Sequence, residues 1–166
     1  MKKEHFLKRF FFPSATTGLF IRIGIVAAAA VIIFGYICIP LKIKGRSMEP
    51  TYHDGDVNCC WRLTYLFSSP KRHDIMLVRF AGQKIMLLKR VVAFEGETVE
   101  FRKGMLFING SRLHEPYLKY PCNWNLSPRT VKKGRVYVIG DNRNVPIHQH
   151  DFGQTPLSRI IGTPLW

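Results

Sequence analysis

Apolar residues are concentrated in one uninterrupted run near the start of the chain. Residues 23–41 contain no charged side chain, and Arg22 and Lys42 flank the run. At ~1.5 Å per residue, a helix of this length covers roughly 28 Å, close to the ~30 Å hydrocarbon core of a bilayer. A buried core helix would carry a polar stripe, which this run lacks. The pattern predicts a transmembrane helix over residues 23–41, preceded by a basic segment over residues 1–22.

A cleaved signal peptide is the alternative interpretation of this run. Small residues should then follow the apolar core as a cleavage site. Here Ala27 to Ala30 lie in the middle of the run, and Val31 to Phe34 continue it. We therefore expect a retained single-pass anchor. The positive-inside rule favours a cytoplasmic N-terminus and a soluble part on the outer face, although basic residues on both sides make the charge difference small.

Residues 42–166 show the short alternating runs that are typical of strands rather than helices. Turns are predicted at Lys103-Gly104 and Asn109-Gly110, the second being the strongest short hairpin signal in the chain. We also expect a surface loop over Pro116–Pro128 and a single helix over Pro156–Ile161. The predicted fold is mainly β: an antiparallel sheet domain, residues 42–166, tethered by one N-terminal transmembrane helix. Its expected strands are Ile75 to Phe80, Lys84 to Phe94, Thr98 to Phe101, Met105 to Ile108 and Arg135 to Ile139.

The chain is strongly basic, and the basic residues are not confined to its N-terminus. Its 166 residues carry a net charge of +14, and residues 42–166 alone carry +10. This balance suits anionic lipid headgroups or nucleic acid. A nucleic-acid module should show a recognition helix or basic patches interleaved with aromatics, and neither is present. We therefore expect a lipid bilayer as a partner and no nucleic acid.

The four cysteines are too few for a disulfide scaffold. Cys38 lies in the predicted span, whereas Cys59, Cys60 and Cys122 lie in the soluble part. One disulfide from Cys122 to either of the other two is possible there, and the sequence leaves the pairing open.

Three segments carry the candidate chemistry. They are Gly45–Thr51 (GRSMEPT), Lys89–Ala93 (KRVVA) and Gly140–Arg143 (GDNR), in this order after one apolar run. Together they resemble type I signal peptidases, the membrane-anchored serine peptidases that remove signal peptides from exported pre-proteins. The resemblance covers nearly the whole chain, since it extends to Arg72-x-Asp74-Ile75, Ile108-Asn109-Gly110, Glu115-Pro116-Tyr117 and Phe152-Gly153.

The resemblance implies that Ser47 is the nucleophile and Lys89 the general base. A serine hydroxyl needs a base, and a lysine can serve as one only when it is neutral, with a pKa well below ~10.4. Desolvation shifts the lysine pKa in that direction, and Leu87 and Val91 share the face of Lys89 on the expected strand. The expected catalytic domain would thus cut by a serine–lysine dyad.

Substrate specificity also follows from the resemblance, as a preference for small residues at the first and third positions before the cut. Met48 and Ile75 are candidate walls of the substrate pocket, and the substrate is expected to pair with the strand Ile75 to Phe80 and with residues preceding Ser47. The backbone N–H of Ser47 is the expected oxyanion donor. A second donor is not identified, because Gly45 stands where some members have a serine.

The third segment departs from the family pattern. Asp141, Asn142 and Arg143 match it and are expected to support the site. Pro146, however, stands where a serine normally orients the lysine, and His148 and His150 replace an Asp and an Arg of a supporting ion pair. The effect of these replacements is open. The two histidines lack a third ligand at recognised spacing, so no metal and no cofactor are expected.

Three alternatives remain beside a general signal peptidase in the plasma membrane. One is a dedicated pilin-processing or conjugation-type peptidase of the same family, and another is a catalytically inactive membrane-bound homologue. The third is a self-cleaving repressor, which shares the dyad but would carry a DNA-binding helix-turn-helix where this chain has its apolar run. The oligomeric state, the organism and the physiological substrates are not determined by the sequence.

Overall fold

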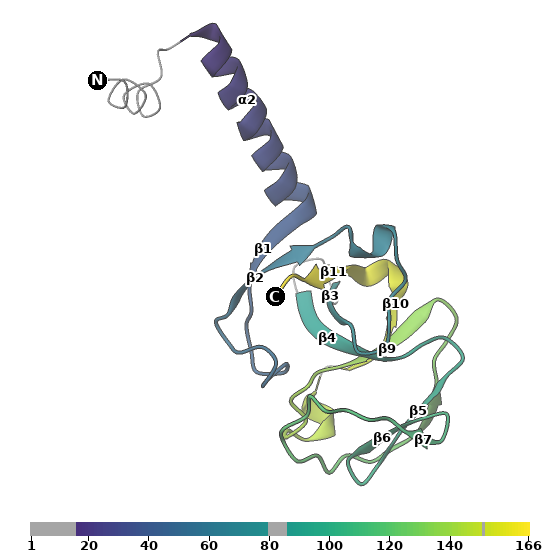
Figure 1. Ribbon diagram of the computed structural model, residues 1–166. Helices are drawn as coiled ribbons and strands as arrows, with labels where there is room; N and C mark the ends of the chain where they lie inside the picture. Colours follow the sequence, from purple (N-terminus) through teal and green to yellow (C-terminus); the bar gives the residue numbers. More distant parts are fainter. Residues whose placement is uncertain (1–15, 80–85, 151) are drawn as a thin grey trace. The chain divides into compact units, whose positions relative to one another are not determined.

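The computed structural model describes residues 16–79, 86–150 and 152–166. The chain forms two compact units, one ending at Cys38 and the other running from Ile39 to Trp166. The first is helical and the second is built from strands (Figure 1). This confirms the predicted class, a mainly antiparallel β domain with one N-terminal apolar helix.

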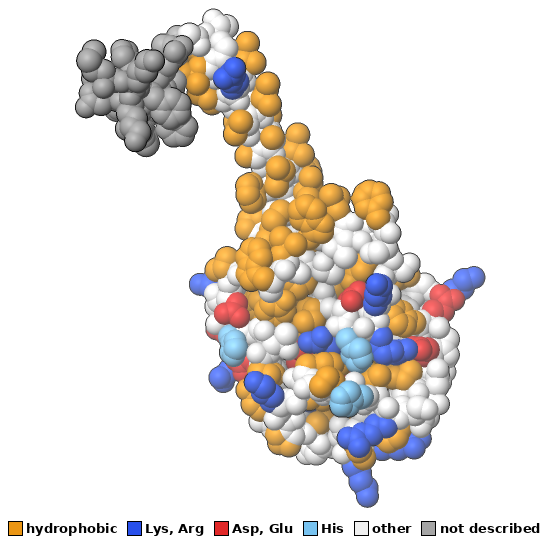
Figure 2. Space-filling model, in the orientation of Figure 1, with side chains coloured by type: hydrophobic (Ala, Val, Ile, Leu, Met, Phe, Trp, Pro, Cys, Tyr) orange, Lys and Arg blue, Asp and Glu red, His pale blue; other side chains and the backbone are white. Residues whose placement is uncertain are grey.

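The apolar segment forms α2 (Thr17–Ile32), which continues as a π-helical turn over Ile33–Ile37. The Thr16 hydroxyl caps its start by accepting a hydrogen bond from the Leu19 N–H at 3.3 Å. Together Thr17–Ile37 is 21 residues, long and apolar enough to cross a membrane, and none of it is buried within the protein. Hydrophobic side chains cover its visible face in Figure 2.

This helix occupies a different range from the predicted 23–41. It starts six residues earlier, so Arg22 lies inside it, and it ends at Ile37 because the chain then becomes strand β1 (Cys38–Lys42). Pro40 lies in this strand, and a proline lacks the N–H that a helix interior requires. The basic N-terminal segment, residues 1–15 of the predicted 1–22, lies outside the described residues.

The β unit contains two sheets. The larger has seven strands in the spatial order β1-β2-β11-β3-β4-β9-β10, and the smaller has four in the order β7-β6-β5-β8. The strands of the larger sheet are β1, β2 (Val57–Trp61), β11 (Ile160–Pro164), β3 (Ile75–Arg79), β4 (Met86–Ala93), β9 (Arg135–Ile139) and β10 (Gly153–Pro156). Those of the smaller sheet are β7 (Ser111–Arg112), β6 (Met105–Ile108), β5 (Thr98–Arg102) and β8 (Leu126–Thr130).

The predicted hairpins are confirmed, and their turns have the expected backbone. Lys103 and Gly104 join β5 to β6, and Asn109 and Gly110 join β6 to β7; all four residues have positive φ. Two-residue turns of this kind need positive φ at both positions, which Asn and Gly adopt most readily.

Near the C-terminal half, one expectation is wrong and another holds only in part. The predicted helix Pro156–Ile161 contains only a 3-10 turn, Leu157–Arg159, because Ile160 enters β11 and pairs with Val78. The predicted loop Pro116–Pro128 ends at β8, and it carries Trp124, which is 2% exposed and packs in the core. In both cases tertiary packing outweighs the local turn signals.

Three buried clusters hold the domain together. The largest joins the four-stranded sheet to β9 through Phe101, Trp124 and Ile139. A second surrounds Val91 and Val138 on β4 and β9. The third places Met48 of the loop after β1 against Leu77 and Leu88. The loop that contains Ser47 is therefore packed on the sheet beside its sequence neighbour Met48.

Candidate active site

Ser47 and Lys89, 42 residues apart in the chain, lie in hydrogen-bond contact. The Lys89 Nζ donates to the Ser47 Oγ at 3.0 Å. Lys89 is 2% exposed and lies opposite Met76 in the β3–β4 ladder, with Val91 on the same face of β4. The structure thus brings a half-buried hydroxyl to an amine that apolar side chains shield from water.

The Ser47 loop is attached to the segment that follows β9. Asn142 donates its backbone N–H to the Ser47 carbonyl oxygen and its Nδ2 to the Arg46 carbonyl oxygen, both at 3.0 Å. On the other side of Ser47, the Thr51 hydroxyl donates to Oδ2 of Asp141 at 2.5 Å. Because the loop is held at both flanks, its hydroxyl has a fixed position relative to β4.

Gly140 allows this close approach. A Cβ at this position would lie 2.3 Å from the Ser47 carbonyl oxygen and 2.9 Å from Nε2 of His150. His150 is buried, donates a hydrogen bond through Nε2 to the Asn142 carbonyl oxygen at 2.9 Å, and meets the Trp124 ring edge to face. Only a glycine fits between the Ser47 loop and the His150 ring.

A buried ion pair fixes β4 next to Lys89. Arg90 binds both oxygens of Asp141, at 2.8 Å through Nε and 2.5 Å through Nη2. Its Nη1 donates to the His73 carbonyl oxygen, and its guanidinium lies 3.9 Å from the Tyr117 ring centroid. A bidentate arginine–carboxylate pair is strongly directional, so it sets the position of the strand that carries Lys89.

A second buried pair joins Arg143 to Glu115. Two hydrogen bonds of 2.6 and 2.8 Å connect them, and the Tyr117 hydroxyl donates to the same carboxylate at 2.6 Å. Burial lowers the pKa of Arg143, but its bonds to Glu115 outweigh this and raise the pKa overall. Burial, with the charge of Glu115, also raises the pKa of Tyr117. Both groups therefore keep their protons throughout the physiological range.

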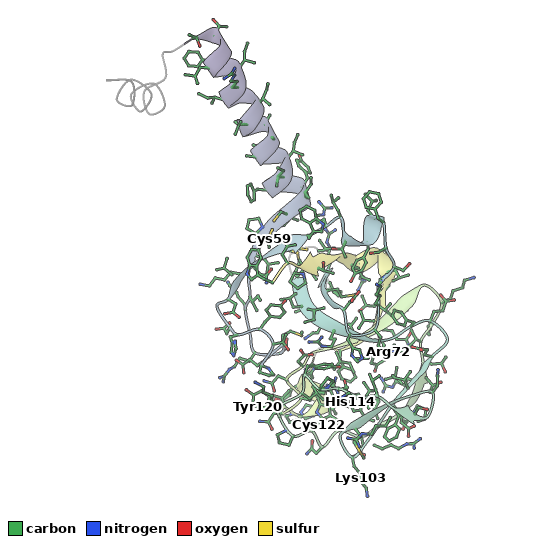
Figure 3. The ribbon with its side chains drawn as sticks, viewed as in Figure 1. Cys59, Arg72, Lys103, His114, Tyr120 and Cys122 are labelled. Carbon is green, nitrogen blue, oxygen red and sulfur yellow. The ribbon has the colours of Figure 1, made fainter. Side chains whose placement is uncertain are left out.

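Sequence reasoning assigned no role to Glu115 and Tyr117. A signal for Glu115 was present, because a buried arginine requires a carboxylate and Glu115 belongs to a motif quoted above. Which carboxylate reaches Arg143 depends on the path of an irregular loop, which the pattern of residues does not specify. Figure 3 shows His114 of this loop, labelled, among the side chains of the domain.

An apolar cleft of about 370 Å³ opens beside the Ser47 hydroxyl. Of the two candidate pocket residues, Met48 lines this cleft and Ile75 does not; Leu77, two residues further along β3, lies there. Leu41, Ile43 and Leu88 also line it. Since side chains alternate along a strand, Ile75 and Leu77 share one face, and only Leu77 is far enough along β3 to reach the cleft.

The substrate was expected to pair with β3, but β3 lies between two other strands of this sheet. Both edges of β3 are occupied, one by β11 and the other by β4. The free edge belongs instead to the first half of β4, because the described β4–β9 ladder begins only at Arg90. Met86, Leu87 and Leu88 line the cleft at this edge.

The replaced residues of the third segment have different environments. Pro146 and His148 are exposed, whereas His150 is buried behind Asn142. Among the described residues, no group of three His, Cys, Asp or Glu side chains could hold a metal ion.

The cysteine pairing differs from the possibility considered above. Cys38 and Cys59 are disulfide-bonded, and Cys60 and Cys122 are free thiols. Figure 3 shows Cys59 and Cys122 well apart in the β unit. Cys122 lies in the loop before β8, where Gly104 packs against its carbonyl group, so it is far from β2.

Comparison with known proteins identifies the family. A family model described as signal peptidase, peptidase S26, matches residues 16–165. The chain is 34% identical to a probable signal peptidase I-1 of Synechocystis, with 79% of this chain and 71% of that protein aligned. It is 33% identical to a signal peptidase I of Bacillus amyloliquefaciens, over 84% of this chain and 78% of that protein.

A plant relative and a solved structure are also similar. The chain is 35% identical to thylakoidal processing peptidase 1 of Arabidopsis thaliana over 74% of its length, but spans only 39% of that protein. A crystal structure of a signal peptidase I from Enterococcus faecalis is 28% identical, with a TM-score of 0.47 over 58% of this chain and 97% of that chain. From the match over residues 16–165, the chain belongs to the signal peptidase family, peptidase S26.

Proposed function

We propose that this protein is a membrane-bound serine endopeptidase that removes N-terminal signal peptides from exported pre-proteins. The observation that carries the proposal is the 3.0 Å contact between Ser47 Oγ and Lys89 Nζ at the end of an apolar cleft. Membership in the signal peptidase family supports the same reaction and substrate class.

The dyad acts by proton transfer through the Lys89 amine in both halves of the reaction. Neutral Lys89 takes the proton of the Ser47 hydroxyl as Oγ attacks the carbonyl carbon of the scissile bond. The resulting ammonium returns that proton to the leaving amine, which leaves a signal-peptide ester on Ser47. Water, deprotonated by the same amine, then hydrolyses the ester and restores the free serine.

Lys89 must be neutral to begin this cycle. Burial penalises the charged form of an amine, and Lys89 is 2% exposed with Met76 opposite it in the ladder. The neighbouring Arg90 forms its own buried ion pair with Asp141.

The substrate enters as an extended strand along the free edge of β4. On the side away from β3, Met86 to Leu88 have no ladder partner among the described strands, and residues 41–45 also line the cleft. Met48 and Leu77 then contact the side chains before the cut, for which small residues are preferred in this family. The backbone N–H of Ser47 is the proposed oxyanion donor.

We place the protein in the plasma membrane with its N-terminus in the cytoplasm and its β unit on the outer face. The Thr17–Ile37 helix supplies the single span. Cys59 of the β unit is disulfide-bonded, and disulfides persist in oxidising compartments outside the cytoplasm. Cleavage then takes place at the membrane surface, where the apolar core of a signal peptide is also held.

The test is cleavage of a pre-protein by the purified full-length chain in detergent or lipid vesicles. Ser47→Ala and Lys89→Ala should each abolish processing, while Ser111→Ala and Lys133→Ala, which alter exposed residues elsewhere, should retain it. The alkaline rise of kcat/KM should show an apparent pKa well below ~10.4. Wild-type cleavage by either dyad variant would refute the assignment.

Substrate range separates the proposal from the dedicated pilin-type peptidase, which the altered residues Pro146, His148 and His150 motivate. Cleavage of several unrelated signal peptides supports the general enzyme, and cleavage of one dedicated substrate alone supports the alternative. Complete inactivity of well-folded wild-type protein would indicate the inactive homologue instead.

A further inference from the structure

A second, smaller hollow lies next to the dyad, beside the apolar cleft. It measures about 70 Å³, and Lys89 contributes to its wall, whereas Ser47 contributes to the larger cleft. Leu87 lines both hollows, so they are adjacent along β4. The described lining residues of the small hollow include no carboxylate.

The chemistry of the proposed dyad predicts which part of the substrate occupies each hollow. The acyl side of the scissile bond must reach Ser47 Oγ, and the leaving nitrogen must reach Lys89 Nζ, which protonates it. The part of the substrate before the cut therefore occupies the cleft beside Ser47. The first residues after the cut leave past Lys89, along the smaller hollow.

Two arginines line this exit. Arg79 is the last residue of β3, and Arg159 ends the 3-10 turn before β11. Both side chains are exposed, and neither has an ion-pair partner among the residues that the structure describes. Arg72, Arg90 and Arg143, by contrast, are each matched to a carboxylate. The exit thus holds two positive charges beside Lys89 that no described carboxylate neutralises.

We propose that Arg79 and Arg159 determine specificity on the product side, by favouring substrates with an acidic residue among the first three positions after the cut. Each residue of an extended chain advances about 3.3 Å, so three residues cover the hollow next to Lys89. An aspartate or glutamate there finds cationic partners, and the peptide reaches them only in the orientation that presents its amide nitrogen to Lys89. This inference rests on the proposed dyad.

The experiment compares matched peptides on the full-length protein in detergent. Each carries the same signal sequence and has Asp or its neutral isostere Asn at mature position one, two or three. In the wild type, the Asp peptide should exceed the Asn peptide in kcat/KM by about twofold to fivefold per arginine engaged at one of these positions, as an exposed ion pair allows. Salt should reduce this ratio, because screening weakens exposed pairs.

Arg79→Gln/Arg159→Gln should bring the Asp-to-Asn ratio to one while the Asn peptide is still cleaved. Arg112→Gln on β7 is the control, because it removes a positive charge from an exposed site in the other sheet and tests the general attraction of a basic domain for acidic peptides. It should leave the ratio unchanged.

The outcomes distinguish failure of the specificity inference from failure of the proposed function. A ratio of one at all three positions in the wild type, or a ratio that survives in the double variant, overturns the specificity inference and leaves the dyad standing. A fall of the ratio in Arg112→Gln equal to that in the double variant also overturns it, in favour of long-range attraction. Absence of cleavage for every peptide would instead refute the proposed function.

Discussion

Gly140→Ala is the substitution that tests most directly whether Ser47, the proposed nucleophile, is held by the segment after β9. The new Cβ would lie 2.3 Å from the Ser47 carbonyl oxygen, whereas ordinary contacts begin near 3.4 Å, so the loop must move by about 1 Å. The same oxygen accepts the Asn142 N–H, and that bond would have to lengthen or break.

The expected effect on activity is larger than the effect on stability. A misplacement of about 1 Å between reacting groups costs on the order of 10²-fold in rate, and we expect that loss in kcat/KM. Overpacking at a buried site lowers the free energy of unfolding by about 1–3 kcal/mol. The folded fraction at the assay temperature should therefore remain high while the Ser47–Lys89 contact is lost.

Gly162→Ala provides a matched control. Its Cβ would lie at the same 2.3 Å from a backbone oxygen, that of Trp61, but in the contact between β11 and β2 rather than at Ser47. Thermal unfolding and peptide cleavage of both variants in detergent give the comparison. Both variants should lose stability. Only Gly140→Ala should lose more activity than its fraction of unfolded protein accounts for. Wild-type kcat/KM in Gly140→Ala, or an equal loss in Gly162→Ala, would refute the reasoning.

Two further predictions concern buried ionisable groups. Asp141→Ala leaves Arg90 buried without its carboxylate, so urea unfolding should show a loss of about 3–5 kcal/mol; a loss below about 1 kcal/mol would show that the pair does not hold β4. Burial raises the pKa of Cys60 from 9.0 to about 11. The unfolded chain then loses this proton before the folded one, so stability present below pH 9 should decline as the pH rises toward 11. Urea unfolding from pH 8 to 11 should show a shallower decline in Cys60→Ala, and parallel curves would contradict this account.

The sequence predicted most of the local structure because its signals are local. A long uncharged apolar segment is stable only in lipid or in a large hydrophobic core. Short alternating segments joined by Asn109-Gly110 or Lys103-Gly104 form hairpins through contacts between residues that are close in the sequence. The helix boundaries and the Pro156–Ile161 segment were wrong because capping by Thr16 and pairing of Ile160 with Val78 decide them. A short apolar run fits a strand or a helix equally well until a partner strand is known.

For the candidate site, too, some residues could be named from the sequence and others only from the structure. Motif order alone named Ser47, Lys89, Asp141, Asn142 and Arg143, since the chemistry of a dyad and a resemblance to a family fix residue types. Which residue faces the cleft could not be predicted: Leu77 rather than Ile75 lies there, and the free strand edge belongs to β4 rather than β3.

The partners of the buried arginines were also decided by the tertiary structure. Glu115 reaches Arg143 across 28 residues, and Asp141 reaches Arg90 across 51. Thus the sequence alone indicated a β domain that follows one apolar helix, and it named a serine and a lysine as candidates for proton transfer. Only the folded chain decided how they meet, because strand order and loop path depend on contacts between residues far apart in the chain, and no local pattern records such contacts.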